Sequence, residues 1–504
     1  MPHSTQTKIA KGAVWMILFK LVERGLGLIS TLILARLLMP EDFGVVAMAM
    51  SFIAMAELLS AFSFDTAIIQ NQEATPEHYN SAWTCSLLLG LMITLMMIAL
   101  AVPIATFYNR PELAWVVIAL AFGPLFTGAQ NIGVVAFLKE LDFRREFRFQ
   151  VSRKLISFCI VVPLAFLFRS YWALVTGILV SKFCGVLISY LMHPYRPRLD
   201  FSKARELLVF SRWLLINNAA GFFKERAADF FVGRMIGANS LGTYNLAYEL
   251  ANLPTTEIGA PINRALLPGF ARMHGPIEVS SAYTNAVGIL ALVALPIAAS
   301  MHALAPYLVP VMLGNKWLDV APLMQLLAFN GALLLFHASI CAVLIGRGFP
   351  ARVMYANLFY TAMLLALLAG IFQYDKNIGV KGAAYAALLT SLLSTPAYLY
   401  QLRHCLGLQP FLFIKAATRP ALASALLILM VQWIIPPYRV GATFLPTFIW
   451  LLAGSIVALG TYVAAVLLMW HVAGRPAGAE QMLLQRLAKE WAQRFKLRTG
   501  SSHV

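Results

Sequence analysis

The feature that most constrains this chain is a series of long apolar runs with few charged residues. We count fourteen runs, most of them near the length of about 20 residues that a membrane helix needs. Backbone groups in hydrocarbon must find their hydrogen bonds within the protein, so only helices and closed barrels cross a bilayer. The runs lack the alternating pattern of barrel strands. The sequence therefore predicts an all-α integral membrane protein with about 14 transmembrane helices.

Composition excludes the other broad classes. Hydrophobic residues make up 60% of the chain and charged residues 12%, whereas soluble domains have about 25% charged residues. The five cysteines are scattered without metal or redox spacing, and no phosphate-binding glycine loop is present. We therefore expect no cofactor, no metal site and no nucleotide hydrolysis. We attribute the net charge of +17 to membrane topology and not to a nucleic-acid partner.

Basic residues are distributed unevenly across the predicted membrane. With the N-terminus inside, the cytoplasmic loops and ends hold 25 of the 39 Lys and Arg residues, the opposite loops hold eight, and six lie at membrane depth. Lys154 is counted among the cytoplasmic residues here, and the fifth run, 154–168, is short. Positive charge accumulates on the cytoplasmic side of membrane proteins. Both termini are therefore predicted to be cytoplasmic.

An internal repeat organises the chain. Residues 35–49 match residues 233–247 at an offset of 198, which aligns Gly44 with Gly242. A period near 200 maps the first six spans onto the next six, as in transporters that hold their substrate between two halves. We predict two pseudo-repeated six-helix bundles, two C-terminal helices, and a cytoplasmic tail that forms a basic amphipathic helix on the anionic leaflet. The predicted boundaries are 1–200, 201–408, 409–470 and 471–504.

Charged side chains at membrane depth are concentrated in the first two helices of each predicted half. Each costs roughly 2.5–3.5 kcal/mol to insert, so we interpret them as facing a polar cavity between the halves. Ion pairs that only lock helices together are the alternative. The basic members suit a phosphorylated anion, because guanidinium and ammonium groups neutralise and hydrogen-bond phosphate oxygens. The predicted anion-binding residues are Lys20, Arg24, Lys224, Arg226 and Arg264.

Acidic and neutral polar residues occupy the same helices. The carboxylates either balance the charge of the empty cavity or bind a coupling ion, and both roles stay open. These residues are Glu23, Glu57, Glu225, Asp229 and Glu249. Contacts to a sugar are predicted for four polar side chains of the seventh and eighth spans. They are Asn217, Asn218, Tyr248 and Asn252.

Five local motifs make the chain resemble one family. They are ILARLLMPEDFGVVAMA (33–49), LKELDF (138–143), YRPRLDFS (195–202), GANSLGTYNLAYELANLP (237–254) and INRALLPGFARM (262–273). Together with the spans and the repeat, they resemble the Wzx-type lipid-linked oligosaccharide flippases of the multidrug/oligosaccharidyl-lipid/polysaccharide exporter superfamily. The resemblance covers nearly the whole chain, and it is strongest to the colanic acid exporter branch.

This resemblance implies a function. The cargo would be an undecaprenyl-pyrophosphate-linked oligosaccharide repeat unit, moved across a bacterial inner membrane by alternating access. The product would be exopolysaccharide, capsule or lipopolysaccharide. Besides the cargo and membrane lipids, a polysaccharide polymerase and other assembly proteins are expected partners. The last two helices would shape a groove for the lipid tail.

The resemblance also implies a site for the pyrophosphate. In related lipid flippases a basic cluster on helices 1, 2 and 8 binds this group, and Arg24 and Arg264 correspond to those positions. The middle of the second span here carries Glu57 in place of a basic residue. The other three basic residues are predicted from the physical argument alone.

Two other functions compete with this one. A cation-coupled multidrug antiporter of the same superfamily would present carboxylates with few competing basic residues. An integral-membrane polymerase or ligase would need a sizeable external loop, and the outward connections here are short. We therefore expect a transporter and not an enzyme.

Overall fold

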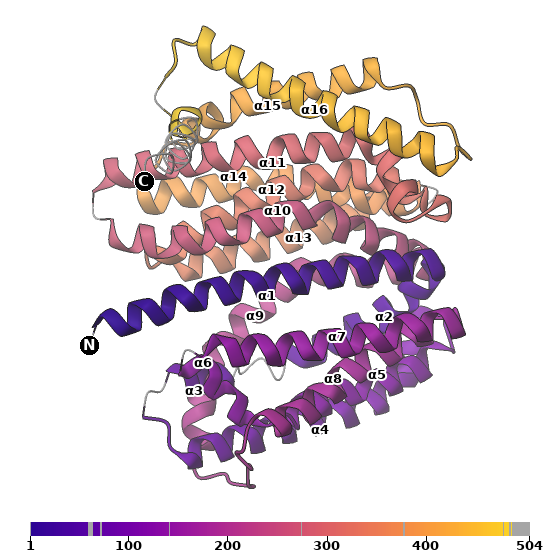
Figure 1. The fold of residues 1–504 in the computed structure, drawn as a ribbon, viewed down its shortest axis with the longest axis vertical. Helices are drawn as coiled ribbons and strands as arrows, with labels where there is room; N and C mark the ends of the chain where they lie inside the picture. The colour runs from indigo at the N-terminus through magenta and orange to yellow at the C-terminus, as the bar shows by residue number, and fades with distance from the viewer. Residues whose placement is uncertain are drawn as a thin grey trace, which may run out of the picture. The chain divides into compact units, whose positions relative to one another are not determined.

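All regular elements of the computed structural model are helices, over the residues that it describes: 2–58, 64–70, 73–140, 142–273, 275–375, 378–476, 478–482 and 485. Inside the helices, the side chains of 2–14, 207–220 and several further positions, most of them between 256 and 277, are outside this description. The chain divides into two compact units, Met1–Asn245 and Leu246–Val504, whose helices Figure 1 labels. The predicted domain boundaries stay a prediction.

The first unit contains nine α-helices and a short 3-10 helix, and the first two turns of a tenth helix belong to it. The elements are α1 (Pro2–Leu37), α2 (Pro40–Glu57), α3 (Phe64–Gln70), α4 (Pro76–Tyr108), α5 (Leu113–Gly128), η2 (Ile132–Val134), α6 (Val135–Lys139), α7 (Phe143–Phe168), α8 (Trp172–Met192), α9 (Ala204–Met235) and α10 (Ala238–Arg272).

The second unit holds the rest of α10 and the later helices. They are α11 (Pro276–Met312), η3 (Asn315–Trp317), α12 (Val320–Gly346), α13 (Pro350–Tyr374), α14 (Val380–Leu406), α15 (Pro410–Ile434) and α16 (Phe444–Val472). In this unit α11 packs against α12, α15 and α16, and α14 packs against α12 and α13.

Each of the fourteen predicted spans overlaps a different helix, although the span 113–137 also covers η2 and α6, and the span 43–64 runs past the end of α2. Eight helices of the described part are long and apolar enough to cross a membrane, and a ninth span is formed if α5 continues through a 60° bend into 132–139. The prediction of an all-α membrane protein is thereby confirmed, whereas fourteen crossings stay a prediction.

Small residues allow α4 and α5 to pack closely in the first unit. A Cβ atom on Gly90 of α4 would lie 2.6 Å from the carbonyl oxygen of Pro124, and one on Gly128 of α5 would lie 2.3 Å from that of Ser86. In lipid, where apolar surface gains nothing by leaving the solvent, close backbone approach at small residues is a main source of helix association. Two glycines therefore fix α4 against α5.

The N-terminal ends of α2 and α10 meet at two repeat-related glycines. A Cβ atom on Gly44 would lie 1.8 Å from the carbonyl oxygen of Ala238, and one on Gly242 would lie 1.9 Å from that of Pro40. Pro40 and Ala238 are themselves separated by the repeat offset of 198 residues. The same contact between a glycine and a facing backbone oxygen is thus made twice, once by the glycine of each repeat. We call these four residues the glycine contact.

An extended connection joins α8 to α9 along one side of α4. The side-chain oxygen of Asn80 accepts hydrogen bonds from the Tyr195 hydroxyl at 2.7 Å and from the Arg198 amide at 2.9 Å. Further along, the Asp200 amide donates to the hydroxyl of Thr84 at 3.0 Å. Side chains of α4 thus replace the sheet or helix partners that an extended backbone lacks.

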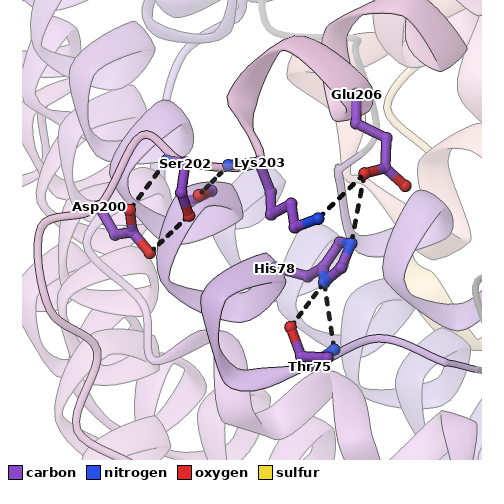
Figure 2. A network of polar contacts seen from close by, with 7 residues as sticks. Thr75, His78, Asp200, Ser202, Lys203 and Glu206 are labelled. Carbon is purple, nitrogen blue, oxygen red and sulfur yellow. Dashed lines mark hydrogen bonds and ion pairs between the residues drawn. The ribbon is translucent and has the colours of Figure 1, made fainter.

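The same connection ends in a network of charged and polar groups (Figure 2). His78 of α4 lies 3.5 Å from the Glu206 carboxylate, and Lys203 lies 3.8 Å from it. On the other side of the ring, Thr75 donates its amide hydrogen to His78 Nδ1 at 3.1 Å. These contacts hold the first turn of α9 against the start of α4.

Asn131 ties the bend after α5 to the same connection. Its side-chain amide donates to the carbonyl oxygen of Tyr195 at 2.7 Å, its side-chain oxygen accepts from the Gly133 amide at 2.9 Å, and it is fully buried. Beside it, burial lowers the pKa of His193. The neutral ring can then accept a hydrogen bond from the Tyr195 amide through Nδ1, at 3.1 Å.

Replacing Asn131 by alanine is expected to destabilise the protein by about 2–3 kcal/mol, because buried backbone groups lose their partners. The melting temperature of the purified protein in detergent measures this loss. Asn239→Ala, at an exposed position of α10, serves as the control. Equal melting temperatures for the two variants would contradict the structural role of Asn131.

The predicted C-terminal tail begins in contact with the second unit. Glu480 is buried and lies 3.1 Å from Arg419 of α15. The neighbouring Ala479 packs on Gly288 of α11, where an added Cβ would lie 2.8 Å from the alanine Cβ. The amphipathic part of the predicted tail lies outside the described residues.

Candidate functional site

Two charged residues of α1 and one of α7 form a cluster where these helices pack together. The Glu23 carboxylate lies 3.6 Å from Lys20 Nζ on its own helix and 4.0 Å from Lys154 Nζ on α7. We call Lys20, Glu23 and Lys154 the α1–α7 cluster, which carries two positive charges and one negative charge. Arg24 is exposed and, as the residue after Glu23, points to another side of α1.

On the predicted topology, the α1–α7 cluster would lie at membrane depth. Glu23 and Lys154 are each about 20 Å from the end of their helix on the predicted outer side, at 1.5 Å per residue. The hydrocarbon core of a bilayer is about 30 Å thick. The helix that contains the fifth run begins at Phe143, eleven residues before Lys154, and it is long and apolar enough to cross a membrane. The count of Lys154 among the cytoplasmic residues stays a prediction.

A second group of polar side chains lies along α7. Gln150 donates to Glu146 at 2.8 Å, and Arg153 donates to the side-chain oxygen of Gln150 at 2.8 Å. Glu146 is buried and Arg153 is half-buried. These side chains are three or four residues apart and find their partners along α7 itself.

Glu57 forms an ion pair that joins α2 to α8. Its carboxylate lies 2.9 Å from Lys182 Nζ, and both side chains are half-buried. Gly123 of α5 makes room for the lysine stem, since a Cβ there would lie 3.1 Å from Lys182 Cδ. The pair is electrically balanced, so it adds no net charge to the site.

Arg226 and Asp229 form an ion pair within α9. Arg226 Nη1 donates to Asp229 Oδ2 at 3.0 Å. The aspartate side chain is 5% exposed and the arginine side chain 45% exposed. A buried carboxylate thus anchors one side of the guanidinium group, and the remainder of that group lies toward the exposed side of the helix.

The remaining predicted site residues of α9 and α10 are only partly described. On α9, Lys224 is half-buried and Glu225 is exposed, and Glu249 of α10 is also exposed. The structure describes the backbone but not the side chains of three predicted residues. They are Asn217, Asn218 and Arg264.

The two predicted sugar contacts of α10 adjoin one another. Asn252 is buried and donates its side-chain amide to the carbonyl oxygen of Tyr248 at 2.8 Å. Its side-chain oxygen faces Gly331 of α12, where an added Cβ would lie 2.5 Å away. Asn252 thus packs inside the second unit, and its contact to a sugar stays a prediction.

The structure brings together several predicted residues and adds two that were given no role. Lys20 meets Glu23 and Arg226 meets Asp229, as neighbours on one helix. Lys154 and Lys182 come from helices that carried no predicted site residue. Lys182 stood out in the sequence as a charge within an apolar run. Lys154 had no such signal, because polar residues precede it directly.

Balanced pairs and an unbalanced cluster have different chemical uses. Ion pairs such as Lys182–Glu57 neutralise charge at depth, and removing one partner leaves the other uncompensated. The surplus of positive charge in the α1–α7 cluster instead favours an anion with several oxygens, such as a phosphate group.

Several apolar helices of membrane-spanning length define a multi-pass α-helical membrane protein. The sequence profile of the family described as "Polysaccharide biosynthesis protein" matches residues 33–322, which is more than half of the chain. The chain belongs to this family. The resemblance carried by the sequence motifs is thereby confirmed at the level of the family.

Individual relatives cover most of the chain. It is 26% identical over 412 residues to the lipopolysaccharide biosynthesis protein WzxC of Escherichia coli (strain K12), covering 80% of this chain and 83% of that protein. It is 25% identical over 496 residues to the succinoglycan biosynthesis transport protein ExoT of Rhizobium meliloti (strain 1021), covering 96% of each. Both relatives carry names from polysaccharide biosynthesis.

A solved structure supports the same fold. The chain superposes on the lipid II flippase MurJ in its inward closed conformation with a TM-score of 0.75, covering 91% of this chain and 100% of that chain. The sequences are 12% identical, so this likeness shows the fold alone.

Proposed function

We propose that this protein is a flippase that moves undecaprenyl-pyrophosphate-linked oligosaccharide repeat units across the bacterial inner membrane. The units would serve the synthesis of exopolysaccharide, capsule or lipopolysaccharide. The family, the names of WzxC and ExoT, and the fold shared with MurJ support this function. The relatives and the structural neighbour are named for biosynthesis, transport and flipping, which favours a carrier over an enzyme.

The observation that carries the proposal is the surplus positive charge of the α1–α7 cluster at membrane depth. A pyrophosphate diester carries about two negative charges, and its hydration shell is lost when it enters hydrocarbon. Fixed ammonium and guanidinium groups replace that shell. Lys20 and Arg24 of α1 are proposed ligands. Arg226 of α9 is a further proposed ligand, and Asp229 anchors its guanidinium group.

Two other basic residues remain in the proposed site. Arg264 is retained because it corresponds to a family position, and Lys224 because it lies at similar depth to Arg226 on α9. Among the carboxylates, Glu23, Glu57 and Asp229 are proposed to balance charge, since each lies beside a basic group. Glu225 and Glu249 keep the open roles that the sequence gave them.

The proposed orientation has both termini in the cytoplasm, which the excess of basic residues in the predicted cytoplasmic loops supports. Assembly proteins such as a polysaccharide polymerase are proposed to receive the unit on the outer side. The amphipathic tail would lie on the inner leaflet, starting from the anchored Glu480.

The experiment that tests the proposal follows the lipid itself. Cells that lack the gene should lose surface polysaccharide and accumulate lipid-linked units that an external glycosidase cannot reach. The purified protein in liposomes should move a short undecaprenyl-pyrophosphate-linked oligosaccharide between leaflets. Ion-driven efflux of organic cations without lipid movement would instead identify a multidrug antiporter.

The membrane potential is expected to drive the cargo outward. Moving one charge across 100 mV changes its free energy by about 2.3 kcal/mol, so two negative charges gain nearly 5 kcal/mol. In vesicles whose lumen faces the predicted cytoplasmic side, an inside-negative potassium diffusion potential should accelerate movement of the cargo to the outer leaflet, and the reversed potential should slow it. Equal rates under both potentials would mean that another ion cancels the charge movement.

A further inference from the structure

We propose that Lys154 is a further ligand of the cargo pyrophosphate and that Glu23 competes with the cargo for it. This inference rests on the proposed function, because it concerns the same anion. It assigns a role to a helix, α7, on which the sequence placed no site residue. It also gives Glu23 a task beyond the general balance of charge.

The distances show that one carboxylate serves two ammonium groups. Glu23 uses Oε2 toward Lys20 at 3.6 Å and Oε1 toward Lys154 at 4.0 Å. Hydrogen bonds between charged groups are usually about 2.7–2.9 Å long. Both contacts are therefore loose, and each ammonium group has three hydrogens to donate. An incoming phosphate oxygen can form shorter bonds to either lysine than Glu23 does.

Exposure agrees with this assignment. The side chains of Lys20 and Lys154 are 43% and 41% exposed, whereas that of Glu23 is 26% exposed. Both lysine side chains are thus more exposed than the carboxylate that they share, which leaves them accessible to an incoming anion.

The residue before Lys154 has partners along α7 itself. Arg153 is half-buried and donates to Gln150, which in turn donates to Glu146. Lys154 lies toward Glu23 of α1, at 4.0 Å. Arg153 also lies within electrostatic range of Glu23, so several basic groups share this carboxylate.

Competition by Glu23 has a consequence for turnover. Without the carboxylate, the two lysines and the proposed ligand Arg24 would bind pyrophosphate tightly and release it slowly. Glu23 repels the phosphate oxygens and takes the lysines back when the cargo leaves. The carboxylate therefore weakens binding and speeds release, and both effects should disappear in Glu23→Gln.

A binding cycle tests the inference. The full-length protein in nanodiscs is titrated with undecaprenyl pyrophosphate, with phosphatidylglycerol as the reference lipid. Lys154→Gln should raise the Kd about tenfold, the factor for losing a bond of about 1.4 kcal/mol to a charged group. Lys154→Arg should stay close to wild type, and Glu23→Gln should lower the Kd while slowing flipping. Arg148→Gln removes an exposed positive charge from the same helix and should leave the Kd unchanged.

The double variant separates a ligand from a structural partner. If Lys154 binds the cargo, Lys154→Gln still raises the Kd about tenfold when Glu23 is already Gln. If Lys154 only neutralises Glu23, the Kd is the same with and without it in that background, and the inference is overturned. The melting temperature of each variant shows that it is folded. A wild-type protein that binds undecaprenyl pyrophosphate no better than phosphatidylglycerol would overturn the proposed function itself, and this inference with it.

Discussion

Cells that carry Arg24→Ala are expected to lose their surface polysaccharide while the protein still reaches the membrane in normal amount. In the proposed function, the guanidinium group of Arg24 on α1 bonds directly to the cargo pyrophosphate. Loss of a charged hydrogen bond of about 3 kcal/mol corresponds to a flipping rate reduced by about a hundredfold. Quantitative staining of the polysaccharide and a leaflet assay on the lipid measure this loss.

The controls for Arg24 separate charge from geometry. Arg24→Lys keeps the charge but not the forked geometry, so we expect partial activity. Arg144→Ala removes an exposed arginine from the first turn of α7 and should have no effect. Arg264→Ala should reproduce the loss seen with Arg24→Ala. Normal polysaccharide in both alanine variants would exclude these two residues from the site.

The second large effect is expected at the glycine contact. A valine at Gly44 or at Gly242 would place its Cβ within 2 Å of a backbone oxygen of the facing helix. A backbone atom cannot move aside as a side chain can, so α2 and the start of α10 must separate. Overpacking usually costs about 1–3 kcal/mol, and we expect a cost at the upper end of this range or beyond it.

The melting temperature of the purified variants measures that cost, and the leaflet assay measures its effect on transport. Gly370 of α13 is the matched control, because an added Cβ there would meet nothing within 4 Å. Gly370→Ala should keep or slightly raise the melting temperature, since alanine favours a helix over glycine. A Gly44→Val protein as stable and active as Gly370→Ala would show that the two helices need not touch.

The helices could be predicted from the sequence, but some of their boundaries could not. Apolar runs gave one helix for each expected span. This reasoning fails at α7, the helix that contains the fifth run. The first half of α7 carries charged residues such as Glu146 and Arg153, so it was predicted to be a polar stretch outside the membrane span. In the structure these charges pair along the helix or with a neighbouring helix. Hydropathy does not register such pairing.

The site could be predicted as a set of residue types and not as a set of partners. The sequence identified Lys20, Glu23 and Arg24 because they interrupt an apolar run of α1. It could not pair Glu57 with Lys182, because the two are 125 positions apart and only the packing of α2 near α8 joins them. The repeat aligned Gly44 with Gly242, yet nothing in that alignment said that the two segments touch.

The glycine contact also has a consequence for the ancestry of the chain. An interface in which one patch meets its own copy is isologous, the form that two-fold symmetric dimers use. Gly44 on Ala238 and Gly242 on Pro40 have this form, because each pair becomes the other when the two repeats are exchanged. A half-length precursor would have carried both sides of the interface on one surface and could have dimerised through it. In the present chain, a substitution on one side of the glycine contact is tolerated only where the facing backbone leaves room for it.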